Sequence, residues 1–489
     1  MKRESFIIWL GVFLLIGLWI GSKFGHSIPE KDKMAQFFKY LKNEYIEDLE
    51  LDSLENQAID YILSSLDPHS TYIPPEQGVV MAERMEGVFS GIGVEFTVKN
   101  DTLVFINIIK SGPAYDSGVQ SGDRVFAIDG DTIVGNELNN EVVTSKIKGK
   151  RGTKVQLDIK RKNKLLTIDL IRDLVPIESV IHLETEDGIG YLKVDRFSET
   201  TYDEFLGHLE QLSDKGMNQL IIDLRDNPGG YLHEAVAMAD EFLEKGKLIV
   251  TTRYRNGSIH NAQAKSGDRY ESLPVHIIID ENSASASEVF TGALQDNDRA
   301  TVYGKTSFGK GLVQEDKILG DGSKVRLTVA YYYTPSGRSI QKPYKADQVL
   351  NKGVFLSDTG RVLYSQGGIE PDVELHNDSV SYFWTFSFGT IDAFGFEFAD
   401  STRESFQQLT LPTFLSSFVV SNKILLLFLE FGGYGLSLED LGASDRKELE
   451  LLLKAGIAKN LWGFNAYRKV VLLGDPTIEK VKSHLKKID

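Results

Sequence analysis

The sequence contains no cysteine, and this absence excludes disulfides, thiolate metal sites and a cysteine nucleophile. Positive charges are outnumbered, with 54 Lys and Arg against 70 Asp and Glu, so the formal net charge at pH 7 is −16. A nucleic-acid partner is therefore disfavoured, because binding to phosphates needs a basic surface. The sequence also has no internal repeat and no low-complexity segment.

Size and composition indicate a folded protein of several domains. A chain of 489 residues is too long for one hydrophobic core, so we expect two to four domains. Hydrophobic residues make up 42% of the chain and charged residues 25%, which is ordinary for globular proteins and argues against extensive disorder.

The N-terminus has the pattern of a membrane-targeting segment. Lys2 and Arg3 precede an uncharged apolar run over residues 6–21, with Trp9 and Trp19 near its two ends. A full span needs ~20 residues, so this run spans a membrane only with its flanks. No small-x-small cleavage site follows, and we predict an uncleaved signal anchor, with a cleaved signal peptide as the alternative. The rest of the chain is then exported into the cell envelope, on the periplasmic side of the inner membrane.

The hydrophobic pattern changes several times along the chain. Residues 30–66 show helical spacing, residues 88–174 read as short strands between glycine turns, and residues 188–329 alternate strands with helices. Beyond residue 378 aromatics are frequent, and residues 446–460 form a predicted helix. The predicted fold class is α/β: a layered α/β core of largely parallel strands with an inserted β-rich domain, an N-terminal helical segment and a partly helical C-terminal region. The predicted boundaries are 1–25, 26–86, 87–174, 175–377 and 378–489.

A turn of small residues lies between a predicted buried strand and a predicted helix, over residues 282–288 with the sequence N-S-A-S-A-S-E. Amides at the start of a helix are unpaired and carry partial positive charge, so the N–H of Ala286 can stabilise an oxyanion formed beside Ser285. Ser285 and Glu288 also match a helix capping box, in which the serine only satisfies backbone donors. On this turn alone both interpretations stay open.

A second loop, residues 304–311 with the sequence G-K-T-S-F-G-K-G, contains the pattern of a nucleotide-binding P-loop. The next residue is Gly311 instead of the Ser or Thr that would hold magnesium, and residues 312–314 read as a strand, so this interpretation is disfavoured. Lys310 is better placed to reach into a site. For Lys310 to act as a base near neutral pH, burial must lower the pKa of its amine well below the ordinary value of ~10.4. Phe308 is a candidate wall of the apolar pocket that would bury it. Otherwise Lys310 is a solvated surface charge.

Together with residues 334–341, T-P-S-G-R-S-I-Q, these two segments resemble the C-terminal processing (tail-specific) peptidases. In that family the nucleophile is a serine in an S-A-S-A-S-E-like turn and the general base is a lysine 25 residues later, as Lys310 follows Ser285. The supporting glutamine corresponds to Gln314, and its implied role is to orient the amine. The resemblance extends over roughly residues 66–373. It implies a serine endopeptidase with a serine–lysine pair, no metal and no cofactor.

A loop with the sequence N-P-G-G, residues 227–230, follows another predicted apolar strand and precedes a helix. By itself it can be a simple β–α turn. Within the resemblance, its glycines expose amides that complete an oxyanion hole together with Ala286. The choice between Gly229 and Gly230 as the second donor stays open.

The β-rich segment opens with a glycine–hydrophobic loop that resembles the ligand-binding loop of PDZ domains. Exposed amides in such a loop bind a free carboxylate, while the ligand adds a strand beside the next one. The implied partner is a protein substrate with a free C-terminal tail and apolar last residues. The loop consists of Gly91, Ile92, Gly93 and Val94.

The resemblance also implies homo-oligomers built through the N-terminal helices and the C-terminal region. The main alternative is a catalytically inactive envelope scaffold in which only the PDZ domain functions. The intact set of Ser285, Lys310 and Gln314 argues against that alternative.

Overall fold

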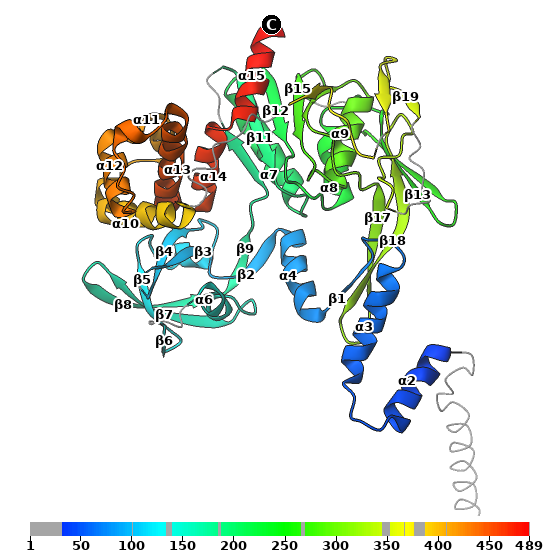
Figure 1. Ribbon diagram of the computed structural model, residues 1–489, viewed down its shortest axis with the longest axis horizontal. Coiled ribbons are helices and arrows are strands. Elements are labelled where there is room, and N and C mark those ends of the chain that lie inside the picture. Colours follow the sequence, from blue (N-terminus) through cyan, green and yellow to red (C-terminus); the bar gives the residue numbers. More distant parts are fainter. Residues whose placement is uncertain are drawn as a thin grey trace, which may run out of the picture.

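The computed structural model describes residues 32–99, 101–133, 139–183, 187–265, 269–344, 353–365, 367–375, 387–406 and 408–488. Figure 1 shows a core of sheets and helices, a smaller β-rich domain below it, a helical domain beside both and an N-terminal helical arm. The predicted α/β class with an inserted β-rich domain is confirmed. The predicted signal anchor, residues 1–25, lies outside the described residues.

The core is built on a six-stranded sheet with the order β10-β11-β12-β15-β16-β21. Its neighbouring strands are parallel except for β10 and β11, as strands alternating with helices predict. Helices α7, α8 and α9 pack on one face, and α15 packs on the other, so successive residues of the central strands are all buried. The bounds are β10 (Val180–Leu183), β11 (Ile189–Val194), α7 (Thr201–Asp214), β12 (Gln219–Asp223), α8 (Leu232–Asp240), β15 (Val275–Ile279), α9 (Ala286–Asp296), β16 (Ala300–Gly304) and β21 (Val373–Glu374).

A second, antiparallel sheet forms the other side of the core. Its order is β1-β18-β13-β14, and β17 also pairs with β18. Through the pairing of β1 with β18, the segment just after the N-terminal arm is brought beside the long β17–β18 ribbon. The bounds are β1 (Thr71–Ile73), β13 (Leu248–Tyr254), β14 (Ile259–Gln263), β17 (Leu312–Ile318) and β18 (Lys324–Tyr333), with a separate hairpin of β19 (Val354–Leu356) and β20 (Val362–Tyr364).

The β-rich domain is inserted into the core through a two-stranded ribbon. Strand β2 enters it and β9 leaves it, and these two strands pair with each other. Inside the domain, the sheet has the order β3-β4-β5-β7-β8 with β6 on β5, and it closes around its own apolar cluster. The bounds are β2 (Val88–Gly91), β3 (Val94–Lys99), β4 (Thr102–Ile108), α5 (Pro113–Asp116), β5 (Arg124–Ile128), β6 (Asp131–Thr132), α6 (Asn140–Ile147), β7 (Lys154–Arg161), β8 (Lys164–Ile171) and β9 (Asp173–Pro176).

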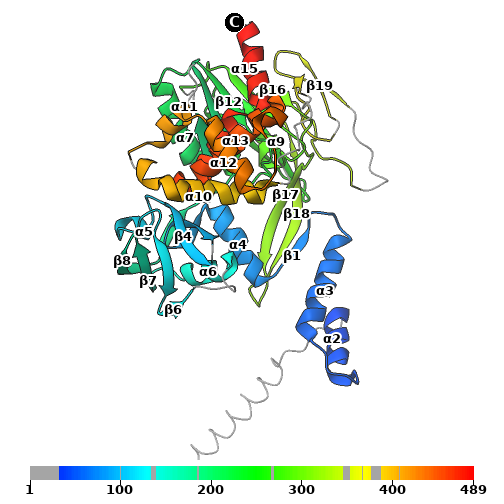
Figure 2. The same cartoon turned by 60° about the vertical axis from the view of Figure 1, so that its left-hand side comes forward.

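The C-terminal region divides between two parts of the molecule. Helices α10 to α13 form a helical domain with its own apolar clusters, and α10 lies along the β-rich domain (Figure 2). Helix α15 instead returns to the core sheet, where Ile478, Val481 and Leu485 are buried. The bounds are α10 (Phe388–Phe406), α11 (Leu411–Ser417), α12 (Asn422–Phe431), α13 (Ala443–Trp462), α14 (Phe464–Leu473) and α15 (Pro476–Ile488).

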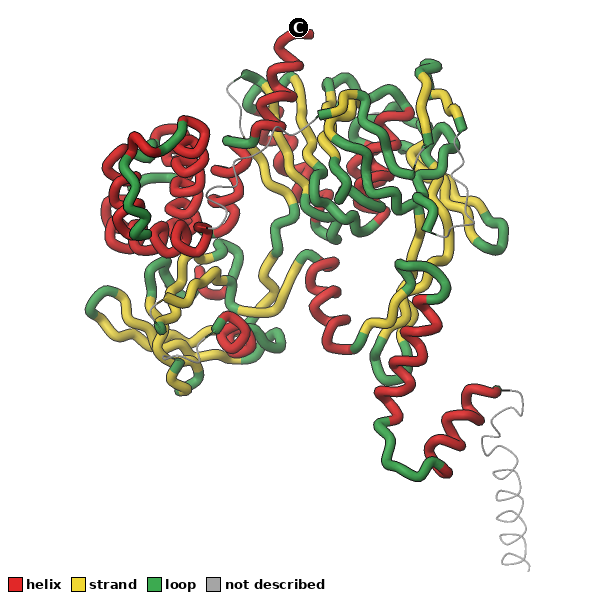
Figure 3. Tube along the Cα trace, in the orientation of Figure 1, coloured by secondary structure: helices red, strands yellow, loops and turns green. Residues whose placement is uncertain are grey.

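The N-terminal arm projects away from the core (Figure 3). It consists of α2 (Lys33–Glu44), which has no buried residue, and α3 (Leu51–Ser64), while α4 (Pro75–Glu86) leads into the β-rich domain. Among the described helices, none is by itself long and apolar enough to cross a membrane, although the bent pair α11 and α12 meets the length and hydropathy limits jointly.

Candidate active site

Ser285 lies at the carboxyl end of the core sheet, where the chain passes from β15 into α9. It is the N-cap residue of α9, and its φ of 56° is in the left-handed region, which is rare for a residue with a side chain. The capping box expected from the sequence is present, and the N–H of Ser285 donates to Glu288 Oε2 at 2.9 Å. Such local strain is characteristic of functional sites, so the capping interpretation and a catalytic role are compatible here.

The glycine loop after β12 lies directly against Ser285. A Cβ placed on Gly229 would lie 2.9 Å from Ala286 N and 2.9 Å from Ser285 Cβ. The Gly229 N–H donates to Asn227 Oδ1 at 2.9 Å, so this amide is already engaged. Within the described part of the chain, the N–H groups of Ala286 and Gly230 have no acceptor. The space beside Ser285 therefore contains the unpaired N–H of Ala286 and no side chain from Gly229, and Gly230 is the next residue of the same loop.

Lys310 lies on the loop between β16 and β17, and its ammonium donates to Gln314 Oε1 at 2.7 Å. Burial lowers the pKa of Lys310 below its ordinary value, and the positive charge of Arg326 lowers this pKa further. The negative charges of Asp67 and Glu288 raise the pKa of Lys310, but by less than burial and Arg326 lower it. Phe308, the predicted wall of an apolar pocket, is instead exposed, with 47% of its surface accessible, and it packs edge-on against His69 with the ring centroids 6.4 Å apart.

The carboxylate of Glu288 joins the serine turn to the lysine loop. Its Oε2 accepts from the N–H of Ser285 at 2.9 Å and of Lys310 at 2.8 Å. Its Oε1 accepts from Ser307 Oγ at 2.6 Å and from the N–H of Gly309 at 2.7 Å. Because two amide nitrogens contact one oxygen atom, the backbones of Ser285 and Lys310 lie within about 6 Å of each other. Burial raises the pKa of Glu288 above its ordinary value, although each of these hydrogen bonds favours the ionised form.

A third segment, between the N-terminal arm and β1, completes this environment. The carbonyl oxygen of His69 accepts from Gln314 Nε2 at 2.7 Å, which fixes the side chain that contacts Lys310. Asp67 holds the turn in place by accepting from the N–H groups of His69 and Ser70, each at 2.8 Å. Burial and the neighbouring charge of Lys310 lower the pKa of His69.

Sequence reasoning placed Ser285, Lys310 and Gln314 in one site. The structure brings the backbones of Ser285 and Lys310 within about 6 Å of each other and joins Lys310 to Gln314 by a hydrogen bond, but among the described residues no hydrogen bond joins Ser285 Oγ to Lys310 Nζ. Sequence reasoning did not find the contact of His69 with Gln314 or the effect of Arg326 on Lys310, because these residues are far from the motifs in the sequence. The signals at His69 were the break at residues 67–70, where proline ends the helical pattern, and the resemblance of residues 67–75 to a segment of the family that the motifs resemble.

The predicted ligand loop of the β-rich domain lies between β2 and β3. The carbonyl oxygens of Ile92 and Gly93 accept from Ala114 N at 2.8 Å and Ile109 N at 3.0 Å. Throughout the described ranges, no acceptor is found for the N–H groups of Ile92 and Gly93. Val94 starts β3, which is an edge strand of the sheet, and Gly91 ends β2. Unpaired amides beside an edge strand are the features that capture of a peptide end requires.

Comparison with known proteins gives matches over most of the chain. The profile of peptidase family S41 matches residues 188–350, that of the PDZ domain matches residues 90–171, and that of a family of unknown function, DUF8443, matches residues 385–463. The chain is 36% identical over 353 residues to the carboxy-terminal-processing protease of Bartonella bacilliformis, covering 70% of this chain and 81% of that protein.

Two further similarities are with a Bacillus enzyme and a solved structure. The chain is 35% identical over 314 residues to the carboxy-terminal processing protease CtpA of Bacillus subtilis, covering 64% of this chain and 66% of that protein. The solved structure of the photosystem II D1 C-terminal processing protease is 25% identical, covers 71% of this chain and 87% of its own chain, and has a TM-score of 0.39.

Proposed function

Because the chain belongs to the carboxy-terminal processing proteases of peptidase family S41, we propose that it is a serine endopeptidase with a Ser285–Lys310 pair. The observation that carries this proposal is the attachment of both residues to one carboxylate oxygen of Glu288, in a place where burial lowers the pKa of the lysine. The PDZ domain binds the C-terminal tail of the protein substrate, and cleavage follows in the core.

The chemical step begins with neutral Lys310. Its amine accepts the hydroxyl proton of Ser285 as the serine oxygen bonds to the carbonyl carbon of the scissile peptide. The resulting ammonium then donates this proton to the departing amine, and the C–N bond breaks to leave an ester on Ser285. Water repeats the sequence on the ester, so the lysine and the serine return to their starting forms. Gln314 holds the amine through each step.

The oxyanion of each tetrahedral intermediate is stabilised by backbone N–H groups. We assign this role to Ala286 and Gly230, because the Gly229 N–H already donates to Asn227. Ala286 is the first residue of α9, so the positive end of the helix dipole adds to its effect. The missing side chain of Gly229 leaves the space in which the oxyanion forms.

We also propose that the enzyme is anchored in a membrane and that its described domains are exported. Residues 1–25 anchor the chain in the inner membrane, and the described domains lie on the periplasmic side. This placement is supported by the apolar run behind Lys2 and Arg3.

Tail recognition is tested by changing only the end of a substrate. An unstructured protein with apolar last residues is compared with the same protein carrying two additional C-terminal aspartates. We expect KM to rise about tenfold with kcat nearly unchanged, since the proposed ligand is a tail with apolar last residues and charged last residues do not match it. The same two aspartates inserted far from the end form the control. Equal kcat/KM for all substrates would exclude capture of the tail.

The role of Lys310 predicts a specific pH dependence. Activity rises with pH as the lysine loses its proton, and the midpoint lies below the pKa of an ordinary lysine because burial disfavours the ammonium. In Arg326→Gln, a positive charge that disfavours the ammonium is lost, so the pKa of Lys310 rises and the acid limb of kcat/KM moves to higher pH. The plateau at high pH stays near the wild-type value. Arg326→Lys keeps the charge and the wild-type profile, and an unmoved limb in Arg326→Gln would contradict the assignment.

A further inference from the structure

Helix α14 begins on the surface of the PDZ domain. The N–H of its first residue, Phe464, donates to Glu95 Oε2 at 2.6 Å, and Asn107 Nδ2 donates to Oε1 of the same side chain at 3.1 Å. Gly463 lies so close to β4 that a Cβ on it would be 2.6 Å from Asn107 Nδ2, and its φ is 88°. A glycine is therefore required at this contact. These contacts join the start of α14 to β3 and β4.

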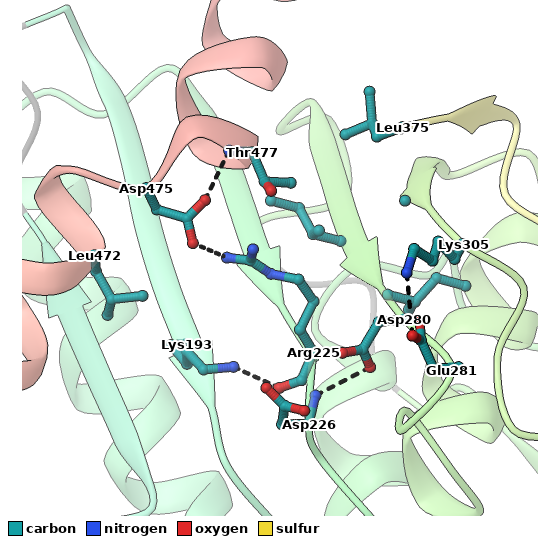
Figure 4. Close-up of a pocket in the computed structure, with 13 residues that line it drawn as sticks. Lys193, Arg225, Asp226, Asp280, Glu281, Lys305, Leu375, Leu472, Asp475 and Thr477 are labelled. Carbon is teal, nitrogen blue, oxygen red and sulfur yellow. Dashed lines mark hydrogen bonds and ion pairs between the residues drawn. The ribbon is translucent and has the colours of Figure 1, made fainter. Parts of the chain in front are cut away.

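The other end of α14 reaches the base of the loop that carries the oxyanion donors. Asp475 follows the helix, and its Oδ2 pairs with the guanidinium of Arg225 at 2.9 Å (Figure 4). Arg225 also binds Asp223, which is completely buried at the end of β12. Asn227, two residues further on, accepts the N–H of Gly229. Arg225 is thus held from the C-terminal region immediately before the loop begins.

The middle of α14 holds the neighbouring segment of the core. Arg468 pairs with Asp195, just after β11. Two residues later, the N–H of Phe197 donates to Gly229 O at 3.0 Å, and Phe197 O accepts from Tyr231 N at 2.7 Å. The segment that brackets the oxyanion loop is therefore also attached to α14.

The ion pairs at the core end are more shielded from water than ordinary surface pairs, so removing one partner leaves a poorly solvated charge. The side chains of Arg225 and Asp475 are each only 18% exposed, and Asp223 holds its charge in the interior with a pKa far below its ordinary range. Without Asp475, the mostly buried guanidinium of Arg225 would keep Asp223 as a partner but lose its contact with the C-terminal region. The pocket of Figure 4 lies here, but its cations, Lys193, Arg225 and Lys305, all contact acidic side chains, so it offers no evident ligand site.

We propose that α14 is a positioning strut, that is, a rigid connection between the PDZ domain and the oxyanion loop of residues 227–230. The position of the PDZ domain then sets the geometry of this loop. Arg468 and Asp475 are the positioning residues through which the strut contacts the core, and Glu95 is the residue of the PDZ domain that contacts the start of α14. A helix of ten residues is about 15 Å long and does not bend easily, so a displacement at one end reaches the other. The inference rests on the proposed function, because it needs Gly230 and Ala286 to act on an oxyanion.

A double-mutant cycle tests the strut with the full chain and an unstructured protein substrate. Asp475→Ser keeps an N-cap for α15 but is too short to reach Arg225, and Glu95→Ala removes the acceptor for Phe464. We expect kcat to fall about tenfold in Asp475→Ser and about fivefold in Glu95→Ala, with KM within about twofold of wild type. The double variant should also lose only about tenfold, since both changes break the same connection.

Matched variants separate positioning from folding. Asp475→Asn keeps an oxygen for Arg225 and should recover most of the rate. Lys486→Ala on α15 removes an exposed ion pair between this lysine and Asp187, and it should leave kcat unchanged. If Asp475→Ser does not fold, the cycle is run with Arg468→Gln. Faster hydrogen exchange of the peptide covering residues 226–231 in Glu95→Ala is a readout that needs no activity.

The outcomes are distinct. Losses that multiply to about fiftyfold in the double variant, an unchanged kcat in either single variant, or a change in KM alone would each overturn the strut. Cleavage that is equally fast in Ser285→Ala would instead overturn the proposed function. In that case unchanged hydrogen exchange at residues 226–231 would overturn the strut as well, and faster exchange would support the mechanical connection alone.

Discussion

In Lys310→Met, we expect kcat for an unstructured protein to fall by about 10³- to 10⁴-fold, because the proposed general base is lost. Methionine keeps the length and the apolar stem of the side chain, so the half-buried site stays filled. The substitution also removes a buried ammonium, whose desolvation is unfavourable, and the melting temperature should therefore be equal to or above that of wild type. Ser285→Ala provides the inactive reference, since it removes the nucleophile itself.

The matched control is Lys305→Met, which changes the other lysine of the same loop. Lys305 is exposed and pairs with Glu281 at 3.1 Å, so its loss should leave kcat unchanged. Initial rates are measured from the product fragments, and a serine-reactive phosphonate should label wild type but not Ser285→Ala. If Lys310→Met kept the wild-type rate while Ser285→Ala was inactive, the nucleophile would stand and the base would have to be sought elsewhere, first at His69.

Gly229→Ala should lower kcat by about 10²- to 10³-fold, because a methyl group that keeps the oxyanion from its donors should have the same effect as the loss of one donor. The new methyl group would lie 2.7 Å from Ala284 O and 2.9 Å from Ala286 N, so it would occupy the space of the oxyanion itself. The φ of 99° at this position adds backbone strain of about 1–3 kcal/mol. Substrate binding through the PDZ domain is distant from this loop, so the affinity for a tail peptide should not change.

The control for this strain is Gly257→Ala, in the turn between β13 and β14. Its φ is 83°, but nothing lies within 4 Å of its added Cβ. We expect Gly257→Ala to show the loss of melting temperature that the backbone strain alone produces, Gly229→Ala to lose more because of its close contacts, and kcat to fall only in Gly229→Ala. Equal kcat in the two variants would show that the space beside Ala286 is not used in catalysis.

Much of the site was predictable because its chemistry is local in sequence. The small residues around Ser285 and the glycines around Lys310 form turns at strand ends, and parallel strands place those ends at one edge of a sheet. The separation of the two motifs then identified the family. The α/β class followed in the same way from apolar strands that alternate with helices.

The connections between segments were not predictable. Gln314 is held by His69 and Lys310 is influenced by Arg326, and neither contact leaves a periodic pattern in the sequence. Glu288 was interpreted as a capping residue, which is correct for one of its oxygen contacts but misses the lysine loop. Likewise, the predicted C-terminal helix over residues 446–460 gave no sign that the following helices return to the core.

The carboxylate of Glu288 has a consequence for how this enzyme can fail. The proposed nucleophile and the proposed base both donate a backbone N–H to the same buried carboxylate oxygen, so a change that frees one loop also removes a contact of the other. Because both loops depend on this one side chain, we expect a substitution of Glu288 to displace the backbones of Ser285 and Lys310 together.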